Sequence, residues 1–228
     1  MIQIELNNIS ETFTSESVQV KALLNINLNI NKGDFIAIIG SSGSGKSTLM
    51  NIIGALVRPT SGVYKLDGQK VSGMNDKKLA NLRKNRIGFV FQNFNLIPRI
   101  SILSNVELPM VYKRVSKVER RERTLTLLKK VGLEGRSSFR PNQISGGEIQ
   151  RAAIARALAN NPDIILADEP TGNLDSKRGE EIMKIFQDLN KEGITVILVT
   201  HDIEKARYAN RIIKMKDGSI VGDENVSR

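Results

Sequence analysis

One segment constrains this chain more than any other: Gly40-Ser41-Ser42-Gly43-Ser44-Gly45-Lys46-Ser47. It fits the pattern G-x-x-x-x-G-K-[ST], and it lies between two apolar stretches, Phe35–Ile39 before it and Thr48–Leu56 after it. The first has the length of a buried strand, and the second has the length of a short helix. Glycines let backbone N–H groups converge on an anion, and a helix N-terminus adds a positive dipole. The segment therefore predicts a strand–loop–helix unit that cradles phosphate groups.

Two side chains of this loop are suited to a nucleoside triphosphate. We expect Lys46 to bridge the β- and γ-phosphates, and we expect the hydroxyl of Ser47 to ligate Mg²⁺. The residues from Gly40 to Gly45, and Thr48 at the start of the helix, would bind phosphate with them. A serine-glycine stretch can also be a flexible turn, but Lys-Ser between a strand and a helix favours the phosphate site.

A second apolar stretch delivers two carboxylates. Ile164–Ala167 leads into Asp168 and Glu169, and ligands in open α/β sheets bind at the C-terminal ends of strands. Asp168 is placed to hold Mg²⁺ and its waters, whereas Glu169 is free to polarise the attacking water as a general base. The pattern could mark a capped strand if it stood alone, but together with the phosphate loop it predicts phosphoryl transfer.

Length and composition allow one large α/β domain, or a domain with an inserted lobe, in a reducing compartment. The 228 residues are 40% hydrophobic, which allows a sizeable core. Cysteine is absent from the sequence, which excludes disulfides and thiolate metal sites and is typical of the cytoplasm. The first ten residues lack the features of a secretory signal, and no apolar run approaches the roughly 18 residues of a membrane helix. We therefore expect a soluble chain.

The net charge of +10 raises the question of nucleic acid. Much of the excess lies in Lys77–Arg86 and Lys113–Lys130, where aromatic side chains are not interleaved with the basic ones. A platform for stacking bases is therefore not visible, and we expect no specific nucleic-acid partner. The basic run 113–130 is either a solvated helix face or a face turned toward anionic lipid or an acidic partner.

The order of the predicted elements indicates a parallel sheet with two additions. The first part of the chain favours short strands, with Asp67-Gly68 typical of a hairpin turn: Ile2–Leu6, Leu24–Ile30, Asp34–Ile39, Val63–Leu66 and Arg86–Phe91. A mostly helical segment follows, and then strands alternate with a helix over Arg178–Lys191: Ile164–Ala167, Thr195–Thr200 and Arg211–Met215.

We expect a single α/β domain over residues 1–228. Residues 1–91 and 161–228 would form the nucleotide-binding core, with an antiparallel β region near the start, and 92–160 an inserted helical lobe. Within the lobe, Ser116 and Glu119 form a capping pattern before a helix that ends at Gly132. We expect this helix to carry Val118, Leu125 and Leu128 inward.

Further motifs resemble the ATP-binding-cassette (ABC) ATPases, a branch of the P-loop NTPases, along almost the whole chain. Ile144-Ser145-Gly146-Gly147-Glu148-Ile149-Gln150-Arg151 is similar to the LSGGQ signature of this family. Gln92 resembles the Q-loop, and Gly172-Asn173-Leu174-Asp175 the D-loop. His201, the one histidine of the sequence, stands where the family has its switch histidine, and Phe13 where an aromatic stacks on adenine.

The resemblance implies that this chain is an ATP hydrolase that works as a homodimer. Ser145, Gly146 and Gly147 would bind the ATP held by the opposite subunit, because a capped helix N-terminus with glycines exposes free N–H groups. Asp175 would couple the two sites. His201 would contact the γ-phosphate, and Gln92 would meet Mg²⁺ and the water.

Glu148 is a departure, because the family mostly has glutamine there. Either side chain can complete a capping box with Ser145, but a carboxylate near a triphosphate repels it. We interpret the glutamate as a tolerated variant.

The stretches Phe89–Pro98 and Asn105–Pro109 resemble the MacB/LolD/BceA group of cassettes. That resemblance implies an integral membrane permease on a separate chain, with this subunit peripheral on the cytoplasmic face and the permease docked beside Gln92 at the run Phe94–Arg99. One alternative is an FtsE-like regulatory ATPase that controls a membrane partner without transport. A soluble ABC ATPase acting on nucleic acid or ribosomes is less favoured, because Lys46 and Ser145 lie only 99 positions apart, too few for the long coiled coils of DNA-repair members.

Overall fold

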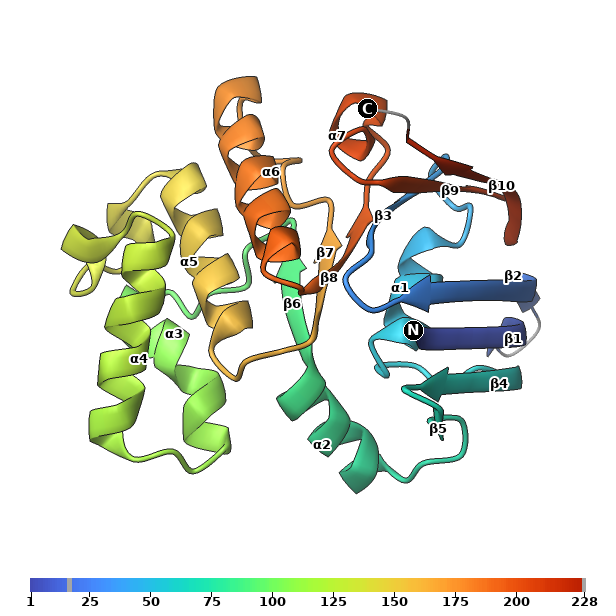
Figure 1. Cartoon of the computed structure of the whole chain (residues 1–228), viewed down its shortest axis with the longest axis horizontal. Coiled ribbons are helices and arrows are strands. Elements are labelled where there is room, and N and C mark those ends of the chain that lie inside the picture. Colours follow the sequence, from blue (N-terminus) through green and yellow to red (C-terminus); the bar gives the residue numbers. More distant parts are fainter. Residues whose placement is uncertain (16–17, 227–228) are drawn as a thin grey trace.

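The larger of two β-sheets carries the phosphate loop at the end of a central strand (Figure 1). The computed structural model describes residues 1–15 and 18–226. Five strands of this sheet are parallel, and β10 pairs antiparallel with β9 at one edge. The spatial order is β10 (Ser219–Asn225), β9 (Arg211–Lys216), β3 (Phe35–Ile39), β8 (Thr195–Val199), β7 (Ile164–Asp168) and β6 (Ile87–Phe91). The parallel sheet expected from the alternation of strands and helices is confirmed.

The smaller sheet is antiparallel and is built from the start of the chain. Its order is β2 (Val18–Asn31), β1 (Ile2–Ser15), β4 (Ser61–Leu66) and β5 (Gln69–Lys70). Asp67 and Gly68 join the last two strands with φ angles of 47° and 75°, as a two-residue hairpin of type I′ requires. The antiparallel β region and its hairpin turn are therefore confirmed.

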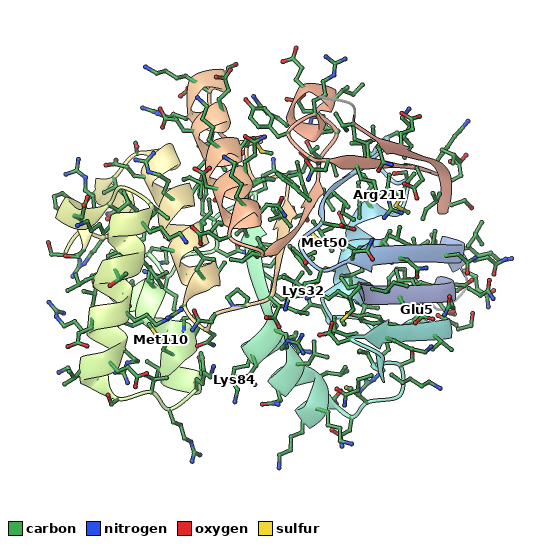
Figure 2. The ribbon with its side chains drawn as sticks, viewed as in Figure 1. Glu5, Lys32, Met50, Lys84, Met110 and Arg211 are labelled. Carbon is green, nitrogen blue, oxygen red and sulfur yellow. The ribbon has the colours of Figure 1, made fainter. Side chains whose placement is uncertain are left out.

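Helices cover both faces of the larger sheet, and two apolar clusters fill the layers. Met50 belongs to the cluster beneath the smaller sheet, and Met110 to the cluster among the helices on the opposite side (Figure 2). In the described part of the chain, no helix is both long and apolar enough to cross a membrane. The helices are α1 (Lys46–Ile53), α2 (Asp76–Arg86), α3 (Ile102–Tyr112), α4 (Lys117–Lys130), α5 (Gly146–Leu158), α6 (Ser176–Lys191) and α7 (Ile203–Ala206), with short 3₁₀ turns at Glu134–Arg136 and Pro141–Gln143.

Arg211 joins the two sheets. Its guanidinium forms a bidentate pair with Asp223 on β10, at 2.7 and 2.6 Å, and donates to the backbone oxygen of Asn29 on β2 at 2.8 Å. Bidentate pairs of this kind fix orientation as well as adding stability. The edge of the larger sheet is therefore held against the smaller one.

The inward face of α4 differs from the one expected. Leu128 is buried, but Val118 and Leu125 are 70% and 41% exposed. The buried stripe runs through Thr124, Leu127 and Leu128 instead. Each residue advances by about 100° around a helix, so Leu125 lies a quarter-turn away from Thr124. The apolar residues of this helix were too few to define its face, and the prediction was wrong for two of the three.

Candidate nucleotide-binding site

The phosphate loop leaves β3 and turns directly into α1. Gly43 and Gly45 adopt φ angles of 78° and 98°, in the left-handed region that favours glycine. Gly45 is also the N-cap of α1 and provides no side-chain acceptor. A Cβ at Gly45 would lie 2.6 Å from the backbone oxygen of Ala22, so the loop is packed tightly against β2. The first N–H groups of α1 therefore remain available to an anion.

Lys46 places its charge inside the curve of this loop. The side chain is buried, and Nζ donates to the backbone oxygens of Gly40 and Ser41, both at 2.8 Å. These two contacts hold the ammonium group where phosphates would enter. A buried ammonium in contact with backbone carbonyls is a fixed positive charge, as phosphate binding requires.

A cavity of about 640 Å³ opens over the loop. It brings together the phosphate loop, the end of β7 and His201 beyond the end of β8, as the sequence predicted. Three residues of β2 also line it, and nothing in the sequence had indicated them. The lining residues are Val20, Lys21, Ala22, Ser42, Gly43, Ser44, Gly45, Lys46, Ser47, Thr48, Asp168, Glu169, Val199 and His201.

Asp168 and Ser47 each bring into the cavity an oxygen atom that could ligate a metal ion. Asp168 ends β7, and its pKa is raised by burial and by the neighbouring charge of Glu169, while Lys46 opposes the rise. Among the described residues, no group of three or more His, Cys, Asp or Glu side chains could hold a metal ion. Mg²⁺ commonly binds through one or two protein oxygens together with substrate phosphates, so this donor set fits it.

Glu169 is fixed from two sides at the edge of the cavity. Its backbone φ of 44° is uncommon for a residue with a side chain. One carboxylate oxygen accepts from the backbone N–H of His201 at 2.9 Å and lies 2.7 Å from Nδ1 of that ring. The other accepts from the hydroxyl of the buried Thr200 at 3.2 Å. A carboxylate held in this way beside a phosphate loop can take a proton from water, and Thr200 is a contributor that sequence reasoning missed.

Phe13 and Gln92 lie beside the cavity rather than in its lining. Phe13 is 46% exposed and pairs across the sheet with Val20, which lines the cavity. The side chain of Gln92 rests on Gly172, where an added Cβ would lie 2.6 Å from Nε2. Its backbone oxygen accepts from Nδ2 of Asn173 at 3.0 Å. The Q-loop and D-loop residues are therefore in contact with each other.

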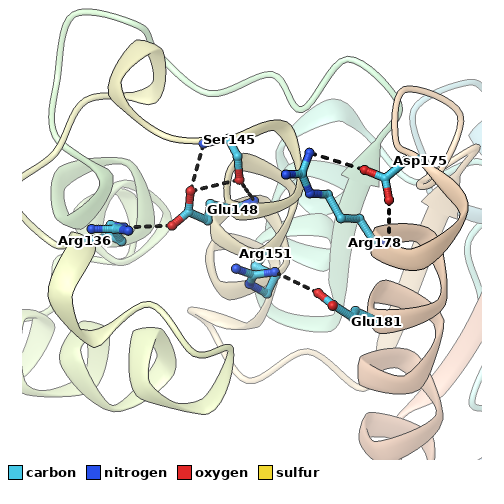
Figure 3. A network of polar contacts seen from close by, with 7 residues as sticks. All are labelled: Arg136, Ser145, Glu148, Arg151, Asp175, Arg178 and Glu181. Atoms are coloured by element: carbon cyan, nitrogen blue, oxygen red, sulfur yellow. Dashed lines mark hydrogen bonds and ion pairs between the residues drawn. The ribbon is translucent and has the colours of Figure 1, made fainter.

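The signature segment forms a capped helix start (Figure 3). Ser145 is the N-cap of α5, and Glu148 completes the capping box, as expected. The side chain of Arg178 covers Gly147, because an added Cβ there would lie 3.1 Å from its Cδ. Asp175 caps α6 and pairs with the same Arg178 at 3.3 Å. Ser145, Gly146, Gly147 and Glu148 do not line the cavity of their own chain.

Gln150 ties this helix to the catalytic edge of the sheet. The side chain is buried, and Nε2 donates to the backbone oxygen of Pro170 at 2.7 Å and to that of Phe91 at 3.4 Å. Pro170 directly follows Glu169 in the chain, and Phe91 directly precedes Gln92. The sequence shows only a glutamine after the signature motif, and its burial, which requires hydrogen-bond partners, becomes visible in the structure.

A protein-family model matches most of this chain. The family model described as ABC transporter matches residues 23–172. The chain belongs to the ABC transporter family. This cassette therefore binds and hydrolyses ATP, as the phosphate loop and the carboxylates after β7 predicted.

Individual relatives agree with this assignment. The cassette is 52% identical over 221 residues to YvrO of Bacillus subtilis (strain 168), an ABC transporter ATP-binding protein, covering 97% of this chain and 96% of that one. It is 49% identical to the macrolide export ATP-binding/permease protein MacB of Shewanella sp. (strain ANA-3), covering 97% of this chain but only 34% of MacB.

Its fold matches a dimeric, post-hydrolysis structure of the ATP-binding cassette MJ0796 with ADP and Pi, with a TM-score of 0.91 and 50% identity over 99% of both chains. MJ0796 is a protein of Methanocaldococcus jannaschii.

Proposed function

We propose that this chain is the ATP-hydrolysing subunit of an ABC transporter, and that two copies enclose two ATP molecules to drive a membrane permease. One observation carries the dimer: α5 begins with a capped N-terminus that contains two glycines, yet this helix start does not line the cavity of its own chain. The N–H groups of Gly146 and Gly147 are among those a helix leaves without a partner. A second copy would supply the phosphate that they bind, and MJ0796 is dimeric in its solved structure.

Within this dimer, each residue of the cavity has a proposed role. Lys46 and the loop hold the phosphates, Ser47 and Asp168 hold Mg²⁺ (Asp168 through water), and Phe13 stacks on adenine. Glu169 acts as general base, with His201 contacting the γ-phosphate. This assignment is supported by the contacts among Glu169, Thr200 and His201 at the cavity edge.

Gln92 would also reach Mg²⁺ and the water when ATP is enclosed, and the lobe 92–160 would move with it. In this structure the Gln92 side chain lies against Gly172, so it would have to move away from Gly172 to reach Mg²⁺. A ligand shifts such an equilibrium only by its differential affinity for the two states. ATP would therefore favour the lobe position that closes the dimer.

The permease would dock beside Gln92 at the cytoplasmic face of the membrane. A groove of about 300 Å³ lies there between β6, α3 and α5. In the apolar run expected to dock, Leu96 packs against the core and Phe94 is half-buried beside Gly146, whereas Ile97 is 41% exposed. Ile97 is therefore the accessible one of these three side chains. The groove is lined by Arg83, Lys84, Ile87, Gly88, Phe89, Phe91, Asn95, Pro109, Arg156, Ala157 and Asn160.

Export of the MacB type is the branch that the relatives favour. MacB is named for macrolide export and joins an ATP-binding part to a permease part in one protein. YvrO, an ABC transporter ATP-binding protein, is matched over nearly its whole length, so the relatives include one that is little more than this cassette. A regulatory ATPase without transport is not favoured by these relatives.

The dimer is tested with a substitution at the signature helix. Ser145→Arg fills the proposed anion site, so ATP-dependent dimerisation, measured by sedimentation velocity, should be lost. ATP affinity of the monomer should be unchanged, because Ser145 does not line its cavity. Ser138→Arg, at an exposed position seven residues earlier, is the control and should dimerise normally. Loss of ATP binding by the Ser145→Arg monomer would contradict the proposal.

A further inference from the structure

The carboxylate of Glu148 connects Arg136 to the backbone N–H and to the hydroxyl of Ser145, the N-cap of α5. Arg136, at the end of the 3₁₀ turn after α4, donates from Nε to Oε1 of Glu148 at 2.7 Å (Figure 3). The other oxygen of Glu148 accepts from the backbone N–H and from the hydroxyl of Ser145, both at 2.8 Å. The carboxylate is only 18% exposed, so it points at Arg136 rather than into solvent.

This arrangement occupies the hydroxyl that an incoming phosphate needs. A hydroxyl has a single proton to donate, and Ser145 donates it to Glu148. Its oxygen meanwhile accepts from the backbone N–H of Glu148 at 3.4 Å. An unpaired carboxylate at this place would therefore compete with a phosphate for the proton and also repel it by charge.

Arg136 reduces both effects. It neutralises the carboxylate, and its hydrogen bond is the main reason why the pKa of Glu148 is lowered to about 2. The guanidinium also shares the negative charge of the carboxylate through a charge-assisted hydrogen bond, so less of that charge acts on the Ser145 hydroxyl and on an incoming phosphate. The guanidinium is itself held in place, because it stacks on the ring of Phe139 at 5.1 Å. The backbone oxygen of Phe139 in turn accepts from Ile102 at the start of α3 at 2.7 Å.

We propose that Arg136 is a positioning residue that makes this glutamate-containing signature able to bind ATP. By pairing with Glu148, it allows Ser145 to turn its hydroxyl to the terminal phosphate of a nucleoside triphosphate on a second copy of the chain. The proposal rests on the proposed function, in which two copies enclose ATP. A purely structural arginine would instead fasten the loop 133–143 to α5, whatever the charge at position 148.

The two roles are separated by a double-mutant cycle in a Glu169→Gln background, where hydrolysis is slowed. Wild-type signature, Arg136→Ala, Glu148→Gln and the double variant are compared by the ATP concentration that gives half-maximal dimer in sedimentation velocity. Arg136→Ala should raise this concentration about fivefold or more, within the usual range of coupling between sites. Glu148→Gln should change it by less than about twofold, and the double variant should resemble Glu148→Gln.

Two further measurements complete the test. Arg136→Lys keeps the charge and should restore most of the dimerisation lost in Arg136→Ala, while monomer ATP affinity stays constant throughout. A double variant as weak as Arg136→Ala, or no effect of Arg136→Ala, would overturn the role of Arg136. Ser145→Arg in the same background tests the enclosed-ATP dimer separately from the role of Arg136. If the Arg136 variants fail their test and Ser145→Arg still dimerises with ATP, the enclosed-ATP dimer is wrong as well. If the Arg136 variants fail and Ser145→Arg is monomeric, only the role of Arg136 is contradicted.

Discussion

The Nδ1 atom of His201 lies 2.7 Å from Oε1 of Glu169, and the backbone N–H of His201 donates to the same oxygen at 2.9 Å. The ring is 72% exposed, whereas the carboxylate is mostly covered. One residue therefore orients the proposed base with its backbone and leaves its side chain at the open edge of the cavity. The orientation of Glu169 is therefore set by the protein itself.

Glu169→Gln should retain ATP binding and lower the turnover number by about 10²–10⁴-fold, the usual contribution of a positioned base. The amide keeps the size of the side chain but does not accept a proton from water. Steady-state ATPase and nucleotide affinity of the purified subunit measure the two effects separately. Turnover close to that of the wild type would remove Glu169 from its role.

Thr200→Val should lower turnover about tenfold, because a hydrogen bond to a charged group contributes roughly 1.5–3 kcal/mol and this one orients Glu169. Thr200 also accepts from the backbone N–H of Asp202 at 3.0 Å, so part of the loss comes from that turn. Thr126→Val, on the exposed side of α4, is the matched control and should leave ATPase unchanged. An equal effect of both variants would mean that the Thr200 hydroxyl has no specific role.

Gly172→Ala should release Gln92 from its resting position. The new Cβ would meet the end of a flexible side chain, Nε2 at 2.6 Å, so we expect the fold to tolerate it. If Gln92 then favours the metal-bound position, apparent affinity for Mg-ATP rises about threefold, equivalent to roughly 0.7 kcal/mol. Gly135→Ala meets no atom within 4 Å and is the control. Weaker binding of Mg-ATP by Gly172→Ala, measured by titration, would contradict the role of Gln92.

The Arg136–Glu148 pair predicts a pH dependence of stability. The pKa of Glu148 is lowered from 4.5 to about 2, so the carboxylate stabilises the folded state fully above pH 4.5. That stabilisation is lost as the pH falls from 4.5 to about 2. The difference in unfolding free energy between wild type and Glu148→Gln, measured in urea, should therefore shrink over this interval. A difference that stays constant with pH would mean that the pair contributes no charge-dependent stability.

Ile97→Asp should reduce association with the permease while leaving the ATPase of the isolated subunit intact, because this side chain is accessible and lies outside the cavity. Val221→Asp introduces the same charge at a 62% exposed position on β10 and serves as the control. Co-purification with the permease and stimulation of ATPase by it are the two measurements. Retained association and stimulation in Ile97→Asp would place the docking surface elsewhere.

Sequence reasoning succeeded where a motif has a fixed spacing and a strand ends in it. The loop around Lys46 and the carboxylates after β7 come together in one cavity, as expected. The helix after the loop begins two residues earlier than predicted, at Lys46, because Gly45 is its cap. Strand β1 runs to Ser15, well beyond the predicted end at Leu6, because polar residues and the bulge at Asn8 mask its alternation.

One helix and one contact were missed, for different physical reasons. Helix α2 is mostly charged and buries only Leu79 and Leu82, so it has almost no apolar periodicity to detect. The contact of Arg136 with Glu148 depends on an irregular loop that folds back onto the start of α5. Such contacts follow from tertiary packing, which no local pattern of residues encodes.

The buried amide of Gln150 also has a mechanical consequence. It is bonded to the backbone on both sides of the catalytic edge, at Pro170 and Phe91, so this turn of α5 is a fixed point. The far end of the helix is held instead by Arg123 of α4, which donates to Ala159 at 2.6 Å. A rigid arm displaces little at its fulcrum and more with distance from it. In the lobe movement proposed above, a small tilt at Gln150 would therefore become a longer displacement at the α3–α4 end of the lobe.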